Sequence, residues 1–156
     1  LIRVKTTEDM LNAVGKYFDS CDVLIKAAAP VDFKPENVSS TKIKKKKDSD
    51  ELVIKYVKTP DIAAHFGKMK KHQIMVGFAA ETNNLLEYAK EKLKEKNFDF
   101  IVANDVSKEG AGFNVDTNIV TIIEKNGEIT NYPIMDKSQV AKIIIDKVKN
   151  LLDNIG

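Results

Sequence analysis

Residues 73–80 read QIMVGFAA and residues 98–103 read FDFIVA. Both runs are apolar, and each is too short to form a helix of its own, which is typical of strands that are buried on both faces. Between them, residues 84–96 form a strongly helical stretch. A strand, a helix of more than ten residues and a second strand predict a crossover unit whose two strands are parallel neighbours.

The same alternation extends toward the amino terminus. Thr6 and Asp9 have the spacing of a capping box, which predicts the start of a helix. Thr59, Pro60 and Asp61 predict a second helix start, with a hydroxyl N-cap, proline at the first helical position and an acid in the first turn. The elements that we expect before residue 73 are a strand over 1–4, a helix over 7–18, a strand over 22–29, a loop over 31–40, a strand over 52–58 and a helix over 59–70.

The remaining chain adds a hairpin and a terminal helix. Asn126-Gly127 lies between two apolar segments, 118–125 and 128–132, and is the dipeptide typical of a tight β-turn. Apolar residues at helical spacing predict a helix over about 140–152. The fold class that follows is α/β, a three-layer Rossmann-like, mostly parallel sheet with a late antiparallel hairpin.

Length and composition limit the possibilities further. The 156 residues are enough for one hydrophobic core, so we expect a single domain over 1–156. No apolar run approaches the length of a membrane span, and the single Cys21 excludes an internal disulfide framework. His65 and His72 offer no ligand spacing, so we predict no metal ligands. We expect a cytoplasmic protein without a membrane partner.

The net charge of +2 conceals a local excess of lysine. Residues 42–71 hold ten lysines against four acids, and five of those lysines lie within residues 42–47. A run of this kind is ordinarily a solvated loop, and it could also bind a polyanion. No aromatic residue interleaves with it, and no recognition-helix motif is present, so we expect no nucleic-acid partner.

Two lysines of the helix predicted over 84–96 have an unusual position. At about 100° per residue, Lys92 and Lys96 project within about 20° of Leu85, on the apolar face that also includes Leu86, Tyr88, Ala89 and Leu93. Lys90 and Lys94 project to the opposite side. A lysine near a helix end can extend to water, but a cation on a core-facing stripe needs an anion or water, and a ligand phosphate is one candidate.

Further candidates follow the predicted strands, because ligands of parallel sheets bind beyond the carboxyl ends of the strands. Asp32 follows the strand over 22–29, where a carboxylate either holds a ribose hydroxyl or a metal or caps a turn. The helix start over residues 59–62 presents free backbone N–H groups to an anion, as every capped helix does. Phe78 is either core packing or part of a ligand site. Together these residues indicate a nucleotide- or polyphosphate-binding domain.

Five blocks resemble one family in order and spacing, the phosphopantothenoylcysteine synthetases of coenzyme A biosynthesis, in their bacterial CTP-dependent form. The resemblance runs from about Val4 to the terminal helix. The blocks are AAAPVDF (Ala27–Phe33), KIKK (Lys42–Lys45), TPDI (Thr59–Ile62), VGFAAET (Val76–Thr82) and IVANDVS (Ile101–Ser107).

This resemblance implies a ligase that joins 4′-phosphopantothenate to cysteine through an acyl-cytidylate, with CTP as the nucleotide and Mg²⁺ beside the triphosphate. It implies that Lys42 supports the first half-reaction. Because Lys42 lies in a predicted loop with no apolar anchor except Ile43, we expect a flap that orders over bound nucleotide. It also implies a nucleotide site in which the backbone of Lys26, Ala27 and Ala28 and the ring of Phe78 frame the base, Asp32 takes the ribose side, Pro60, Asp61, Ile62 and Ala63 lie along the nucleotide, and Lys92 and Lys96 reach the triphosphate.

The family pattern also includes a segment that has no counterpart before Leu1. Family members begin with a strand, a Gly-rich turn and a helix, so we expect this chain to be the carboxyl-terminal two thirds of a synthetase domain. The resemblance implies a homodimer with contacts near the late hairpin, and fusion to or association with a flavin-dependent decarboxylase. The alternative is a non-catalytic nucleotide-binding or assembly fragment of the same domain.

Overall fold

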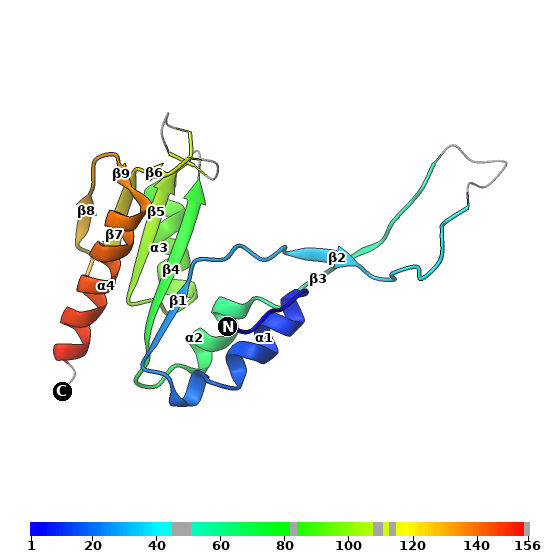
Figure 1. Cartoon of the computed structure of the whole chain (residues 1–156), viewed down its shortest axis with the longest axis horizontal. Helices are drawn as coiled ribbons and strands as arrows, with labels where there is room; N and C mark the ends of the chain where they lie inside the picture. Colours follow the sequence, from blue (N-terminus) through cyan, green and yellow to red (C-terminus); the bar gives the residue numbers. More distant parts are fainter. Residues whose placement is uncertain (45–50, 82–83, 108–110, 113–114, 155–156) are drawn as a thin grey trace.

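A five-stranded sheet lies at the centre of the structure, which is a computed structural model that describes residues 1–44, 51–81, 84–107, 111–112 and 115–154 (Figure 1). β1, β4 and β5 are parallel, whereas β7 and β8 are antiparallel to their neighbours. The predicted mostly parallel sheet with a late antiparallel hairpin is confirmed. In sheet order the strands are β1 (Val23–Lys26), β4 (Ile74–Glu81), β5 (Phe100–Asp105), β7 (Val120–Glu124) and β8 (Ile129–Asn131).

Helices cover both faces of the sheet, which confirms the three predicted layers (Figure 1). Ile101 and Ala103 of β5 join one core cluster, and Phe100 and Val102 join the other, because successive side chains of a strand point to opposite faces. The first cluster lies under α1, α2 and α3, and the second lies under α4. The helices are α1 (Thr7–Gly15), α2 (Ile62–Met69), α3 (Leu85–Glu95) and α4 (Lys137–Asp153).

A two-stranded arm projects from the sheet (Figure 1). It contains β2 (Phe33–Pro35) paired antiparallel with β3 (Tyr56–Lys58), and the described residues 36–44 and 51–55 extend it beyond these two strands. The strand predicted over 52–58 is therefore wrong in its first half, because among the described residues only 56–58 are paired in a sheet. The loop predicted over 31–40 is wrong at β2. Alternation in the sequence indicates an extended chain, but pairing depends on which segment lies alongside it.

Other boundaries differ from the prediction at the ends of elements. Residues 1–4 form no strand, because no described strand lies beside them, so that prediction is wrong. α1 begins with the predicted capping box of Thr6 and Asp9 but ends at Gly15, and a short 3-10 turn (Phe18–Ser20) follows, in which Phe18 is buried. A second small pair, β6 (Thr117–Asn118) with β9 (Met135–Asp136), was not predicted.

The predicted turn at Asn126-Gly127 is confirmed. Gly127 has a φ of +91°, a conformation that favours glycine, and its N–H donates to the Glu124 carbonyl at 2.9 Å. The side-chain oxygen of Asn126 accepts from the Glu128 N–H at 2.9 Å. These local hydrogen bonds set the register of β7 against β8.

None of the helices in the described part of the chain has the length and apolar character that crossing a bilayer requires.

Gly67 determines how closely α2 approaches the end of α3. The Asn97 side-chain amide donates to the Gly67 carbonyl at 3.0 Å. A Cβ at Gly67 would overlap the backbone carbonyl of Lys96, which cannot move without shifting the end of α3. The absence of a side chain at Gly67 therefore positions Lys96.

We expect Gly67→Ala to destabilise the fold by about 1–3 kcal/mol, because the added methyl group overpacks the contact between α2 and α3. Urea denaturation measures the change. Gly15→Ala is the matched control, since the nearest atom to its added Cβ, on the Phe66 ring, is 3.8 Å away. Equal stability of the two variants would contradict the close approach at Gly67.

Candidate functional site

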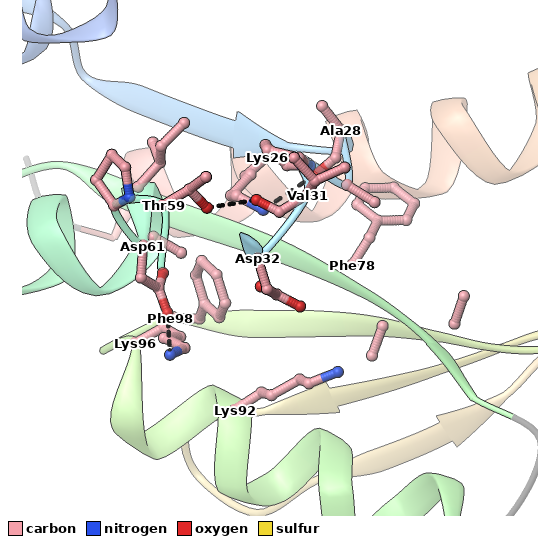
Figure 2. A pocket seen from close by; sticks show the side chains of 17 residues that line it. Lys26, Ala28, Val31, Asp32, Thr59, Asp61, Phe78, Lys92, Lys96 and Phe98 are labelled. Atoms are coloured by element: carbon pink, nitrogen blue, oxygen red, sulfur yellow. Dashed lines mark hydrogen bonds and ion pairs between the residues drawn. The ribbon is translucent and has the colours of Figure 1, made fainter. Parts of the chain in front are cut away.

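A cavity of about 430 Å³ opens at the carboxyl ends of β1 and β4 (Figure 2). Ligands of parallel α/β sheets bind in this position. The volume lies within the range of small-molecule sites. The lining consists of Lys26, residues 28–32, residues 59–63, residues 78–80, Lys92, Lys96 and Phe98.

The lining includes most of the residues that the sequence predicts for the nucleotide. Ala27 and Lys42 are the exceptions, since neither lines the cavity. The prediction omitted Phe98, for which the sequence carries no signal beyond its place in an apolar run. It also omitted other residues that lie within or next to the quoted blocks: Ala29, Pro30, Val31, Thr59, Ala79 and Ala80. The predicted members found in the lining are Lys26, Ala28, Asp32, Pro60, Asp61, Ile62, Ala63, Phe78, Lys92 and Lys96.

The lysines of α3 and its C-cap divide between two sides, as the helical projection predicts. Lys92 and Lys96 are partly buried and line the cavity, whereas Lys90 and Lys94 are exposed. The predicted apolar face is wrong at Leu86 and Tyr88, which are exposed. In the structure, the side of α3 that packs against the sheet is limited to the stripe that contains Ala89.

Asp61 connects the start of α2 to Lys96. Its Oδ1 accepts from the Ala64 N–H at 2.9 Å, and its Oδ2 accepts from the Lys96 ammonium. Burial alone would raise the pKa of Asp61, but the hydrogen bonds from Ala64 and Lys96 and the charges of Lys96 and Lys26 hold it below its usual value. Asp61 is therefore an anion that holds a cation at the edge of the cavity.

The prediction of Thr59 as the N-cap of this helix is wrong, because Asp61 is the N-cap and Pro60 precedes it. The Thr59 hydroxyl donates to the Val31 carbonyl instead. The backbone N–H of Thr59 also donates to the Asp32 carbonyl, at 2.9 Å. Thr59 thus joins the two chain segments that border the cavity.

Lys26 enters the cavity from the end of β1. Its ammonium donates to the Ala28 carbonyl at 3.0 Å. Burial lowers the pKa of Lys26, although the nearby carboxylates of Asp61 and Asp32 act in the opposite direction.

Lys42 lies on the arm, outside the cavity, with an exposed side chain. The lysine run continues into residues 45–47, which lie outside the described residues. A second cavity of about 610 Å³ adjoins the first and shares residues 28–31 and Thr59 with it. Its other wall includes the start of α1, where Glu8 accepts from Lys34.

We expect Asp61→Ala to destabilise the fold by about 1 kcal/mol, because it removes the N-cap of α2. Asp61→Asn keeps a side-chain oxygen for the Ala64 N–H and should lose less. Because the folded-state pKa of Asp61 is lowered, the advantage of Asp over Asn is present above its ordinary pKa of 3.8 and is lost as pH falls through the folded-state value. Urea denaturation of the three proteins across this pH range measures the difference, and an Asn variant as unstable as Ala would contradict the cap.

The chain is similar to proteins of coenzyme A metabolism. Residues 1–152 match the family described as "DNA/pantothenate metabolism flavoprotein C-terminal domain". The chain is 45% identical over 155 residues to the Coenzyme A biosynthesis bifunctional protein CoaBC of Bacillus subtilis (strain 168), which covers 99% of this chain and 38% of that protein. It is 44% identical over 153 residues to a protein named cysteine/cysteine sulfinic acid decarboxylase from an unknown prokaryotic organism, covering 97% of this chain and 42% of that protein.

Among solved structures, the crystal structure of the C-terminal domain of a Coenzyme A biosynthesis bifunctional protein CoaBC has a TM-score of 0.79 and 37% sequence identity. The match covers 98% of this chain and 66% of that one. This chain therefore spans about two fifths of the length of the two curated relatives and about two thirds of the solved domain.

Proposed function

Because this chain belongs to the family of DNA/pantothenate metabolism flavoprotein C-terminal domains, we propose that it acts in coenzyme A biosynthesis as the phosphopantothenoylcysteine synthetase domain. The proposed reaction is the CTP-dependent ligation of 4′-phosphopantothenate with cysteine. The observation that supports it most is that one cavity gathers most of the residues expected to bind the nucleotide, from four separate parts of the chain.

The reaction has two steps in this proposal. The carboxylate of 4′-phosphopantothenate attacks the α-phosphate of CTP, the bond to pyrophosphate breaks, and an acyl-cytidylate forms. The cysteine amine then attacks the acyl carbon, CMP leaves with the electron pair of the broken bond, and the amine loses a proton as the amide forms. Because the first step concentrates negative charge on phosphate oxygens, cations fixed in the site lower its barrier.

The groups that line the cavity support this proposal (Figure 2). Lys92 and Lys96 supply positive charge from the side of α3. The Phe78 ring and the backbone near Ala28 provide an apolar and hydrogen-bonding surface for the base. Asp32 accepts from ribose hydroxyls, which is a common role for a carboxylate after a strand of such a sheet. The second cavity next to residues 28–31 offers room for the other substrate.

The residues of the cavity also fit an Mg²⁺ ion that accompanies the triphosphate. Protein sites commonly hold Mg²⁺ by one or two carboxylates together with substrate phosphates. Two carboxylates, Asp32 and Asp61, line the cavity, and Asp61 is already engaged by Lys96 and by the start of α2. Because Asp32 is proposed for the ribose and Asp61 is engaged, the substrate phosphates and water would hold most of the ion's ligand positions, and the ion would supply positive charge to the phosphates.

Lys42 would support the first half-reaction from the arm. Because Lys42 lies outside the first cavity, this role requires the arm to close over that cavity and to exclude water from the acyl-cytidylate. The arm carries exposed apolar side chains, among them Phe33, Leu52 and Val53. We propose a homodimer in which a second chain covers such residues, together with strands near the hairpin of β7 and β8.

The wider context is also a proposal. Since the curated relatives are longer than this chain, we propose that it works with a flavin-dependent decarboxylase domain, fused or associated, in the cytoplasm. The name of the second relative describes a decarboxylase, and this chain matches only 42% of that protein. The alternative function is a non-catalytic nucleotide-binding or assembly fragment of the same domain.

The two functions predict different results in a pyrophosphate-release assay. A longer chain that carries the amino-terminal strand, Gly-rich turn and helix should release pyrophosphate from CTP only when 4′-phosphopantothenate is present, because the carboxylate is the attacking group. Absence of release there would exclude the ligase. CTP binding by the 156-residue chain without turnover would support the fragment.

The side of α3 that faces the nucleotide can be tested separately. We expect Lys92→Ala to weaken CTP binding about tenfold or more, because it removes a charged contact to phosphate. Lys94→Ala, an exposed lysine two residues away, should leave binding unchanged. Isothermal titration calorimetry with CTP measures the affinity of both variants. Equal losses of CTP affinity would overturn the assignment of the binding face.

A further inference from the structure

The Lys26 side chain lies on the same face of the sheet as α2 and α3. Leu24, two residues earlier in β1, packs against the core cluster beneath those helices, and residues two apart in a strand share a face. In the view of Figure 2, Lys26 lies across the cavity from Lys92 and Lys96, with Asp32 between them. The family resemblance assigns only the backbone of Lys26 to the nucleotide. It gives the ammonium group of Lys26 no role in binding.

This ammonium group lacks the carboxylate partner that two other partly buried lysines of the chain have. Lys70 is paired with Asp99 at 2.6 Å, and Lys96 is paired with Asp61. Within the described ranges, Lys26 has no carboxylate at ion-pair distance, and its acceptor is the neutral carbonyl of Ala28. That bond uses one of three N–H donors. A partly buried charge without a counter-ion is costly, and an anionic ligand group would offset the cost.

We propose that the Lys26 side chain binds a phosphate of the nucleotide and completes, with Lys92 and Lys96, a cluster of three cations that approach it from two sides. This inference rests on the proposed function, because it takes the ligand to be a nucleotide triphosphate. The phosphate replaces the Ala28 carbonyl as acceptor, so the ammonium group exchanges a neutral acceptor for an anionic one and gains the attraction between opposite charges.

A pH dependence follows from the charges that face Lys26. These are Asp32 after β1, Asp61 at the start of α2, and Lys92 and Lys96 of α3 and its C-cap. Burial lowers the pKa of the free ammonium, and a bound phosphate favours its charged form. Affinity should therefore decrease as pH rises through the lowered pKa of free Lys26, by up to about tenfold per pH unit.

Isothermal titration with two probes, CTP and inorganic triphosphate, tests the proposal on the 156-residue chain. We expect Lys26→Met to weaken binding of both probes about tenfold or more. Lys26→Arg should bind within about threefold of the unchanged chain and should lose the decrease at alkaline pH that Lys26 causes, because arginine stays charged. Lys90→Met is the matched control, an exposed lysine of α3 that should bind as the unchanged chain does. Thermal unfolding of each variant checks the fold.

The outcomes separate this inference from the proposed function. If Lys26→Met binds like Lys90→Met, the inference is wrong and the proposed function stands. If the unchanged chain binds triphosphate but not CTP, the proposed function fails, and the triphosphate affinities still decide the role of Lys26. Binding of neither probe would overturn both. Should Lys26→Met unfold, the alkaline binding profile of Lys26→Arg decides, and a profile like that of the unchanged chain would overturn the inference.

Discussion

Strand β4 hydrogen-bonds to a parallel strand on each side, and over residues 74–77 both of its faces are buried. This requires apolar cover above and below the sheet, which α4 supplies on one side and α2 and α3 supply on the other. Toward the carboxyl end of the strand, Phe78 is partly buried and Ala80 is exposed, because the cover ends there. The cavity begins where this packing stops.

The packing against β4 also positions the charged side of the cavity. Gly77 leaves space for the Phe98 ring, which a Cβ at that position would overlap. Phe98 directly follows the turn that ends α3, so its contact with Gly77 holds the end of that helix against the sheet. Lys96 lies in the same turn and reaches Asp61 at the start of α2. A steric contact in the core thus determines where a cation is held.

The lysines of the cavity differ in the partners of their ammonium groups. Asp61 neutralises Lys96 in part, whereas Lys26 relies on a neutral carbonyl within the described structure. The ion pair with Asp61 offsets part of the desolvation cost of Lys96 when no ligand is bound. The cavity still has positive charge for a ligand that carries several negative charges, which is the property expected of a triphosphate site.

Local pattern was sufficient where neighbours in the sequence decide the structure. The apolar runs at 73–80 and 98–103, the capping box of α1 and the turn at Asn126-Gly127 were all predicted from residues that interact within a few positions. The projection of α3 separated Lys92 and Lys96 from Lys90 and Lys94, since helical geometry alone fixes their relative directions. The site prediction beyond these lysines depended on ordered blocks that resemble a family, and most of their residues meet in one cavity.

Long-range contacts decided the rest. Thr59 is not an N-cap, because the carbonyl of Val31 is within reach of its hydroxyl, and Leu86 and Tyr88 are exposed because α3 touches the sheet along one narrow stripe. The pairing of β2 with β3 and the place of Lys42 outside the cavity likewise depend on which segments lie side by side. The sequence by itself determined the order and type of most elements and the side of α3 and its C-cap that carries the partly buried lysines, because both follow from local backbone periodicity. Only the tertiary structure decided which charges are paired, since ion pairs such as Asp61 with Lys96 join residues that are distant in the chain.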